Sequence, residues 1–233
     1  MERLDKIIVS QGKYSRSEVK KLASQGKISV DNKIVKKTDL KVDKKSAKIL
    51  VNGEEIKIKE HIYLILNKPK GYVSATEDIK DKTVLELVPE QFFRKSLFPA
   101  GRLDKDTTGL MIITDDGVLA HNILSPKKHI RKIYEVTLDI PVTDKMVKKF
   151  AEGIKLKDGE CKSAKLEITG KYTCRVTITE GRYHQIKRMF GCCEAKVLEL
   201  NRICMGNLYL PKDLKISKCR ELKEEGLLAL QEK

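Results

Sequence analysis

Four carboxylates lie within the stretch GRLDKDTTGLMIITDDG, residues 101–117, where a carboxylate could act as a nucleophile or a general base. They are Asp104, Asp106, Asp115 and Asp116. Leu110–Ile113 is continuous apolar sequence and predicts a buried strand, so two carboxylates precede this strand and two follow it. The two ends of the strand therefore have to be considered separately.

After the strand, Asp115-Asp116-Gly117 predicts a turn into a helix over Val118–Leu124. Either carboxylate can cap this helix, because the first N–H groups of a helix favour negative charge. We therefore interpret both aspartates as structural.

Before the strand, Asp104 lies between Arg102 and Lys105, and these cations would favour its ionised form. Asp106 is followed by Thr107-Thr108-Gly109 and fits a turn. The residue types alone leave both Asp104 and Asp106 open as the chemically active group.

The elements that must position these residues are mostly short strands. Alternating apolar residues predict strands over Lys132–Asp139 and Thr173–Thr179, and helices fit at Thr143–Glu152 and Tyr183–Phe190. No βαβ rhythm or glycine-rich nucleotide loop is evident, so the sequence predicts an α+β fold with a mixed, mostly antiparallel sheet. A change of composition near residue 60 predicts two domains, 1–60 and 61–233.

The first domain is predicted to contain a helix with one basic face. Ser15 and Glu18 form a capping box at the start of a helix over Arg16–Gln25, and Gly26 ends it. Arg16, Lys20 and Lys21 lie away from the apolar stripe of this helix, and a short hairpin follows. A helix with a basic face on a small α/β domain is suited to binding RNA through its phosphates.

Charge is the strongest compositional signal. The chain has 48 Lys and Arg against 33 Asp and Glu, a net charge of +15, of which residues 1–60 carry +7. Such a field attracts polyanions and supplies affinity rather than sequence choice. RNA, DNA and an anionic membrane all remain open as partners, beside a basic protein that its lysines merely keep soluble.

Cysteine and histidine spacing does not indicate a metal site. The six cysteines have no C-x-x-C spacing and are predicted to be reduced core residues, and the four histidines form no pair or cluster. The longest apolar runs are short, and the N-terminus lacks the apolar stretch of a signal peptide. We predict a cytoplasmic protein without membrane contact.

The N-terminal segments RLD, SRSEVKK, GKISVDNKIV and KILVNGEEI resemble the small RNA-binding domain of the S-four type, first described in a ribosomal small-subunit protein. The resemblance covers about residues 1–58. In that family the basic helix lies against structured RNA and contacts phosphates and shape more than bases. The RNA contacts that the resemblance implies here are Arg3, Arg16, Lys20 and Lys21.

The stretch around the four aspartates resembles the active-site signature of pseudouridine synthases, in the branch that modifies ribosomal RNA and carries an S-four-type domain in front. Three further motifs match the same branch in order: LNKPKGYVSAT (Leu66–Thr76), RKIYEV (Arg131–Val136) and EGRYHQIKRMF (Glu180–Phe190). The resemblance covers essentially the whole chain.

The resemblance implies that Asp104, in the G-R-L-D motif, is the catalytic residue. The implied reaction breaks the N-glycosidic bond of one uridine, turns the uracil and rejoins it through C5 to C1′ of the ribose. It needs no redox change, so no cofactor is expected. An ionised carboxylate suits either attack at C1′ or removal of the 2′ proton, and the sequence does not choose between them.

Other residue roles follow from the same resemblance. Tyr134 matches the active-site tyrosine that stacks near the flipped base, although packing with Val136 and Leu138 would also explain it. Lys187 falls where the family places a basic partner that keeps the aspartate ionised and oriented. Arg102, Arg182 and Arg188 are expected to contact RNA. The target uridine has to leave its stack, and the phosphate contacts of both domains would offset that unstacking.

Within the family, EGRYHQIKRMF followed by LELNRICMGNL is more similar to the small-subunit enzyme, so we predict 16S-type ribosomal RNA or an assembling small subunit as the partner of a monomeric enzyme. A large-subunit uridine is the alternative. A non-catalytic assembly factor, or binding of DNA or a membrane by charge alone, are the rivals from other classes.

Overall fold

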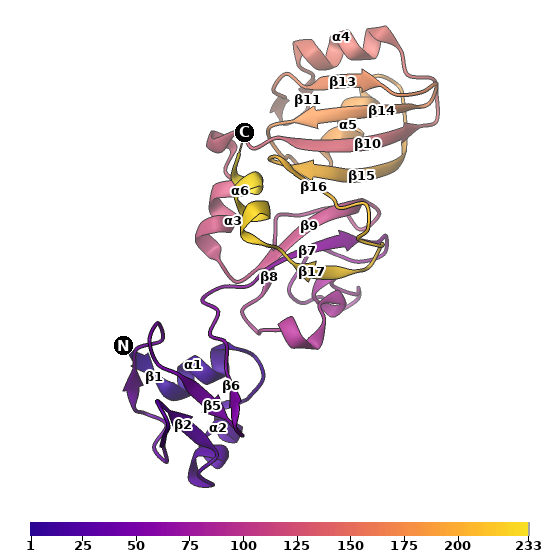
Figure 1. Cartoon of the computed structure of the whole chain (residues 1–233). Helices are drawn as coiled ribbons and strands as arrows, with labels where there is room; N and C mark the ends of the chain where they lie inside the picture. Colours follow the sequence, from indigo (N-terminus) through magenta and orange to yellow (C-terminus); the bar gives the residue numbers. More distant parts are fainter. Residues whose placement is uncertain (233) are drawn as a thin grey trace. The chain divides into compact units, whose positions relative to one another are not determined.

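The computed structural model describes residues 1–232, which form two compact units (Figure 1). The first unit contains Met1–Ile62 together with Pro89–Leu97, and the second contains the remainder of the described chain. The sequence predicted one boundary near residue 60 and did not predict that a later segment joins the first unit. None of the helices within residues 1–232 is long and apolar enough to cross a membrane.

The first unit packs two helices against a small sheet. Helices α1 (Leu4–Ser10) and α2 (Arg16–Ser24) share an apolar core with strands β2 (Ile28–Val30) and β5 (Ile49–Val51). The sheet order is β3-β2-β5-β6, and β1 pairs with β4 beside it. The remaining strands of the unit are β1 (Glu2–Arg3), β3 (Lys33–Ile34), β4 (Lys41–Val42) and β6 (Glu54–Glu55).

The predicted capping box of α2 is confirmed. The Ser15 side chain accepts from the backbone N–H of Glu18, and the Glu18 carboxylate accepts from that of Ser15 at 2.7 Å. The helix ends at Ser24, one residue earlier than predicted, with Gln25 as its C-cap. This cap fixes the start of the helix that carries the basic residues.

Segment Pro89–Leu97, which includes the short helix η2 (Glu90–Phe92), is held to the first unit by Arg94. The Arg94 side chain is 4% exposed and donates to Gln11 Oε1 and to the carbonyl of Lys59, both at 3.0 Å. A Cβ at Gly12 would overlap the carbonyl oxygen of Phe93, so the two backbones are in close approach.

The second unit is built on a nine-stranded sheet with the main order β13-β14-β10-β15-β9-β7-β17, from which β8 and β16 branch. All its strand pairs are antiparallel except β9 with β15, which confirms the predicted α+β fold. The strands are β7 (Tyr63–Lys68), β8 (Phe98–Ala100), β9 (Thr108–Thr114), β10 (Lys132–Leu138), β13 (Lys165–Ile168), β14 (Thr173–Ile178), β15 (Val197–Met205), β16 (Leu208–Tyr209) and β17 (Cys219–Glu221).

Four α-helices accompany this sheet: α3 (Gly117–Leu124), α4 (Asp144–Glu152), α5 (Gln185–Gly191) and α6 (Glu224–Gln231). Helix α6 packs beside α3, as Figure 1 shows. Asp116 caps α3 by accepting from the N–H groups of Val118 and Leu119, as the sequence predicted for one of the two aspartates. Shorter elements are η1 (Val84–Leu87), η3 (Pro126–Lys128), β11 (Lys155–Leu156) and β12 (Gly159–Glu160).

Two predictions about this unit were wrong. The predicted helix over Tyr183–Phe190 begins only at Gln185, as helix α5. Tyr183 and His184 lie outside it because His184 adopts the left-handed conformation, with φ of 48°. Cys192 is exposed, so it is not a core residue, whereas Cys161, Cys174 and Cys204 are buried as predicted.

Strand register places one row of side chains across the sheet at the level of the aspartate loop. Lys68 of β7 is paired with Gly109 of β9, and Gly109 is paired with Arg202 of β15. Arg202 is in turn opposite Tyr134 of β10. Because directly paired residues project to the same face, Lys68, Arg202 and Tyr134 share one face of the sheet.

Gly109 allows the parallel strands β9 and β15 to approach each other closely within this row. Its φ is +102°, and a Cβ there would overlap the carbonyl oxygen of Arg202 and the Oδ1 atom of Asn201. A side chain would therefore force β9 and β15 apart next to the aspartate loop.

We predict that Gly109→Ala lowers the free energy of unfolding by about 2–4 kcal/mol, through backbone strain and overpacking. Urea unfolding of the full chain measures it. Gly117→Ala is the matched control, because nothing lies within 4 Å of its Cβ position, and it should change stability by less than about 0.5 kcal/mol. Equal stability of the two variants would contradict this account.

Candidate active site

Asp104 lies in the loop between β8 and β9, and its two carboxylate oxygens contact different side chains. Oδ1 is 3.3 Å from Nε2 of His184, and Oδ2 is 3.2 Å from Nζ of Lys187. The Asp104 side chain is 26% exposed, so it is sheltered but reachable. Both partners come from the segment around the start of α5, about eighty residues further along the chain.

Lys187 also binds the second aspartate of the loop. Its Nζ lies 2.6 Å from Oδ1 of Asp106, whose side chain is 68% exposed. Burial disfavours the charged form of Lys187, but its hydrogen bonds to Asp106 and Asp104 outweigh burial and raise its pKa. The hydrogen bond from Lys187 lowers the pKa of Asp106. The ammonium therefore stays charged beside both carboxylates.

The side chain of Lys68 is fully buried and binds the backbone of the loop that carries Asp104 and Asp106. Its Nζ donates to the carbonyls of Thr107 at 2.8 Å, Asp104 at 3.0 Å, Pro69 at 3.1 Å and Lys105 at 3.3 Å. Burial lowers the pKa of Lys68 to about 8, and the charges of Asp106 and Asp104 oppose that shift. Lys68 thus fixes the main chain whose side chains face Lys187.

The segment after Lys68 braces the same loop from another side. The Ser74 hydroxyl donates to the carbonyl of Leu103 at 2.7 Å and accepts from its N–H at 3.0 Å. The N–H of Gly71 donates to the carbonyl of Lys105 at 2.8 Å. The motif at 66–76 is therefore a support for the motif at 101–109.

Tyr134 lies in the row on the sheet, and its side chain is buried with 7% exposure. Within residues 1–232 no hydrogen bond or ion pair joins Tyr134 to Asp104, whose polar partners are His184 and Lys187. Arg202 beside it is 2% exposed and donates through Nε to the carbonyl of Leu110 at 2.7 Å, while its Nη2 is buried without a partner in the described chain. Tyr134 is therefore flanked by a buried cation.

The arginines of the last motif are engaged within the protein. Arg188 pairs with Asp158, and Arg182 donates to the carbonyl of Glu160 at 2.7 Å, both in the β11–β12 hairpin. Arg102, in contrast, is exposed. Lys105, which the sequence placed beside Asp104 as a stabilising cation, instead pairs with Asp81 at 2.5 Å. The side chains that contact the Asp104 carboxylate are those of the distant residues Lys187 and His184.

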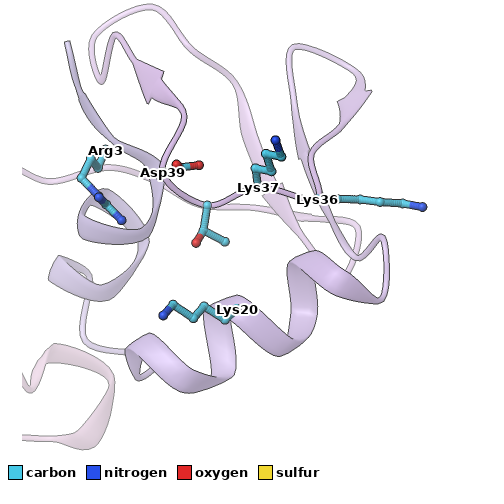
Figure 2. Close-up of a pocket in the computed structure, with 6 residues that line it drawn as sticks. Arg3, Lys20, Lys36, Lys37 and Asp39 are labelled. Atoms are coloured by element: carbon cyan, nitrogen blue, oxygen red, sulfur yellow. The ribbon is translucent and has the colours of Figure 1, made fainter.

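Two of the predicted RNA contacts of the first unit lie at one shallow hollow. Arg3 of β1 and Lys20 of α2 both line it, and Figure 2 shows Arg3 next to Asp39 with Lys20 projecting from a separate helix. Lys36, Lys37, Thr38 and Asp39 complete its lining. Arg3 is paired with Asp5 at 2.7 Å, whereas Arg16 and Lys21 are exposed on α2 outside this lining. The hollow is strongly cationic.

Residues 62–191 match the family described as RNA pseudouridylate synthase, and residues 2–47 match the S4 domain. The chain belongs to the RNA pseudouridylate synthase family. It is therefore an isomerase acting on RNA, and both the family resemblance and the RNA-binding domain predicted from the sequence are confirmed.

Relatives of this synthase match it almost end to end. An uncharacterized RNA pseudouridine synthase YtzG of Bacillus subtilis is 41% identical, over 99% of this chain and 98% of the relative. Ribosomal small subunit pseudouridine synthase A of Escherichia coli is 39% identical, over 98% of this chain and 99% of the relative. A crystal structure of pseudouridylate synthase is 37% identical, with a TM-score of 0.69, and covers 99% of this chain and 100% of that one.

Sequence reasoning about this synthase missed two residues at the site. The sequence does contain one signal for Lys68, a lysine at the end of a buried apolar strand, since a buried charge needs partners. The predicted helix over Tyr183–Phe190 includes His184, whereas in the structure a left-handed turn precedes the helix and His184 contacts Asp104. The catalytic roles of Asp104, Tyr134 and Lys187 remain predictions, and the structure brings the first and the last of these together.

We predict that Lys68→Met lowers the free energy of unfolding by about 2–4 kcal/mol, because the loop carbonyls lose their shared donor. A displaced Asp104 should also lower kcat/KM at least about a hundredfold. Urea unfolding and tritium release from RNA carrying 5-tritiated uridine measure the two effects. Full activity in Lys68→Met would show that the loop does not depend on this ammonium.

The matched control is Lys132→Met, in which the lysine lost has one carbonyl partner, Ile130 at 3.1 Å. Burial, and then the charge of Arg202, lower the pKa of Lys132 to about 8. Below pH 8 the folded chain therefore carries a buried ammonium at a cost on the order of 3 kcal/mol. The same cost applies to Lys68, but there the ammonium holds four carbonyls in place, whereas only one carbonyl offsets the cost at Lys132. Lys132→Met should therefore be more stable than the native chain at pH 7.

The advantage of Lys132→Met should shrink as the pH rises from 8 towards 10.5. In this window folded Lys132 has lost its proton while the unfolded chain still holds one, so the stability of the native chain rises relative to that of the variant. A difference between the two chains that is constant from pH 7 to 10 would contradict the assignment of a depressed pKa to Lys132.

Proposed function

We propose that this synthase converts one uridine of small-subunit ribosomal RNA to pseudouridine, with Asp104 as the catalytic carboxylate. The observation that carries the choice of RNA is the end-to-end similarity to enzymes named ribosomal small subunit pseudouridine synthase A, from Salmonella typhimurium, Yersinia pestis and Escherichia coli. A sequence identity of 37–39% over 98% of the chain includes both the S4 domain and the catalytic unit.

The geometry favours Asp104 over Asp106 as the reacting carboxylate. Each oxygen of Asp104 has one side-chain partner, and the group is largely sheltered, whereas Asp106 is two-thirds exposed. A sheltered carboxylate held by a fixed ammonium keeps one orientation, which suits attack at C1′ or removal of the 2′ proton. In this proposal Asp106 instead helps to hold Lys187 in place.

The proposed reaction balances without a cofactor. The bond from N1 to C1′ breaks, a bond from C5 to C1′ forms, C5 loses a proton and N1 gains one. Tyr134 lies on the same sheet face as Lys68, and in our proposal its ring stacks on the uracil after the base has left its stack. Among residues 1–232 no group of histidine, cysteine, aspartate and glutamate side chains is arranged to hold a metal ion.

The cationic hollow of the first unit supports the proposed RNA contact. Arg3, Lys20, Lys36 and Lys37 gather there, and a phosphate backbone is the ligand that such a surface attracts irrespective of sequence. In this proposal the first unit supplies affinity, and the catalytic unit selects the uridine.

We predict that Asp104→Asn abolishes tritium release from small-subunit ribosomal RNA carrying 5-tritiated uridine, a loss of at least about a thousandfold in kcat. Asp106→Asn should keep kcat within about tenfold, because Lys187 retains Asp104. Both variants should bind the RNA as tightly as the native chain. Loss of tritium release in Asp106→Asn and not in Asp104→Asn would assign catalysis to Asp106. Native rates of release in both variants would show that neither carboxylate is catalytic.

The choice of RNA is tested by mapping pseudouridines in ribosomal RNA from cells that lack this protein. Loss of one modification in the small-subunit RNA, restored by the native gene and not by Asp104→Asn, is the expected result. Loss in the large-subunit RNA would overturn the choice of subunit. Unchanged pseudouridines would favour a non-catalytic assembly role.

The hollow gives a separate prediction on salt dependence. Replacing Lys20, Lys36 and Lys37 together by glutamine should reduce the slope of log K against log salt by about 2–3, since roughly one counterion is released per phosphate contact. Filter binding with small-subunit ribosomal RNA measures the slope. Replacing the exposed lysines 145, 148 and 171 by glutamine makes the same charge change elsewhere and should leave the slope nearly unchanged. Equal slopes for the two triple variants would contradict the assignment.

A further inference from the structure

Tyr183 is an exposed aromatic side chain next to the candidate catalytic carboxylate. Its side chain is 73% exposed, and its ring stacks on that of His184 with centroids 3.8 Å apart and planes 18° from parallel. His184 in turn contacts Asp104 at 3.3 Å. One stacked ring therefore separates Tyr183 from Asp104.

The backbone that carries this stack is braced. His184 is held in the left-handed conformation, with φ of 48°, which is uncommon for a residue with a side chain. The carbonyl of Tyr183 accepts from Nη1 of Arg188 at 3.1 Å, and the N–H of Arg182 donates to Oε1 of Gln185 at 3.0 Å. Gln185 is buried and donates to Glu180 at 2.7 Å.

A braced turn that ends in an exposed ring has the properties of a preformed binding surface. The contacts around residues 182–188 fix the turn, yet the Tyr183 ring buries little surface of its own in the described chain. Strain at one residue is retained where the surroundings impose it, and such residues gather at functional sites. A ligand that stacks on a ring already held in place loses little conformational entropy.

We propose that Tyr183 is a stacking platform for the nucleobase next to the uridine that reacts. This inference rests on the proposed function, because it places an RNA strand across Asp104. When a uridine leaves its stack, the neighbouring base loses a partner on one face, and an aromatic ring can replace that partner. The His184 side chain contacts both Tyr183 and Asp104, so the proposed stacking site is next to the place where the uridine would react.

The charge of the surroundings favours RNA as the occupant of the platform. Arg182 and Arg188 are paired with acidic residues of the protein, Glu180 and Asp158, and the carboxylates of Asp104 and Asp106 near the turn are bound by Lys187, so the attraction for a polyanion comes from the net charge of the whole chain, +15. A protein segment or a lipid surface would bury the ring against apolar groups. A nucleobase can stack on the ring while the phosphates of its strand are attracted by the positive charge of the protein. Tyr183 is thus an RNA-binding residue and not a catalytic one.

The experiment measures tritium release by the full chain from small-subunit ribosomal RNA that carries 5-tritiated uridine, isolated from cells lacking this protein. Tyr183→Ala should lower kcat/KM about 5- to 150-fold, the range of one lost base stack, through KM, with kcat within about threefold. Tyr183→Leu should behave like Tyr183→Ala. Tyr183→Phe should stay within about twofold of the native chain.

Tyr172→Ala is the matched control, because Tyr172 is also exposed, at 41%, but lies in the turn between β13 and β14. It should match the native chain. The salt dependence of binding should be the same for Tyr183→Ala and the native chain, because no phosphate contact is removed.

Two outcomes would overturn the platform. Native kcat/KM in Tyr183→Ala would show that no base stacks there. A fall in kcat with unchanged KM, or equal losses in Tyr183→Phe and Tyr183→Ala, would show that the residue acts through His184 or through its hydroxyl.

Failure of the proposed function can be told apart from failure of the platform. If the native chain releases no tritium, the proposed function fails, and the platform is then judged by filter binding of the same RNA. Tighter binding by the native chain and Tyr183→Phe than by Tyr183→Ala supports the platform, whereas equal binding by all three overturns it.

Discussion

The contact of one buried ammonium with four backbone carbonyls underlies the arrangement of the site. Lys68 ends a strand of the central sheet, and its Nζ binds carbonyls contributed by residues 69, 104, 105 and 107. A buried cation is unfavourable unless dipoles surround it, and the aspartate loop supplies those dipoles. An apolar side chain at this position would fill the space but could not determine the path of the loop.

Three cationic or polar groups thereby hold one aspartate from separate directions. Lys68 fixes the backbone of Asp104, while Lys187 and His184 contact its carboxylate oxygens. These three residues come from two sequence motifs, and the aspartate comes from a third. The joint occurrence of these three motifs therefore has a physical basis, because the first and the last supply the contacts that hold the aspartate of the second.

Local features of the fold were predictable from the sequence, and long-range ones were not. The capping box at Ser15 and the helix start at Asp116 follow from hydrogen bonds within a few residues, so their sequence patterns sufficed. The pairing of Lys187 with Asp104 was predicted only through family resemblance, since nothing local relates residues so far apart. The contacts of Lys68 and the left-handed turn at His184 depend on the assembled sheet, and periodicity carries no information about either.

The segment Pro89–Leu97 has a consequence for how the chain acquires its structure. The first unit is discontinuous in sequence, since Arg94 is bound by the Gln11 side chain and by the carbonyl of Lys59. A fragment that ends at residue 60 would lack this guanidinium and leave the acceptors to water. During synthesis from the N-terminus, the RNA-binding unit therefore reaches its final set of contacts only after part of the catalytic unit has been made, so its maturation is tied to a segment encoded inside its neighbour.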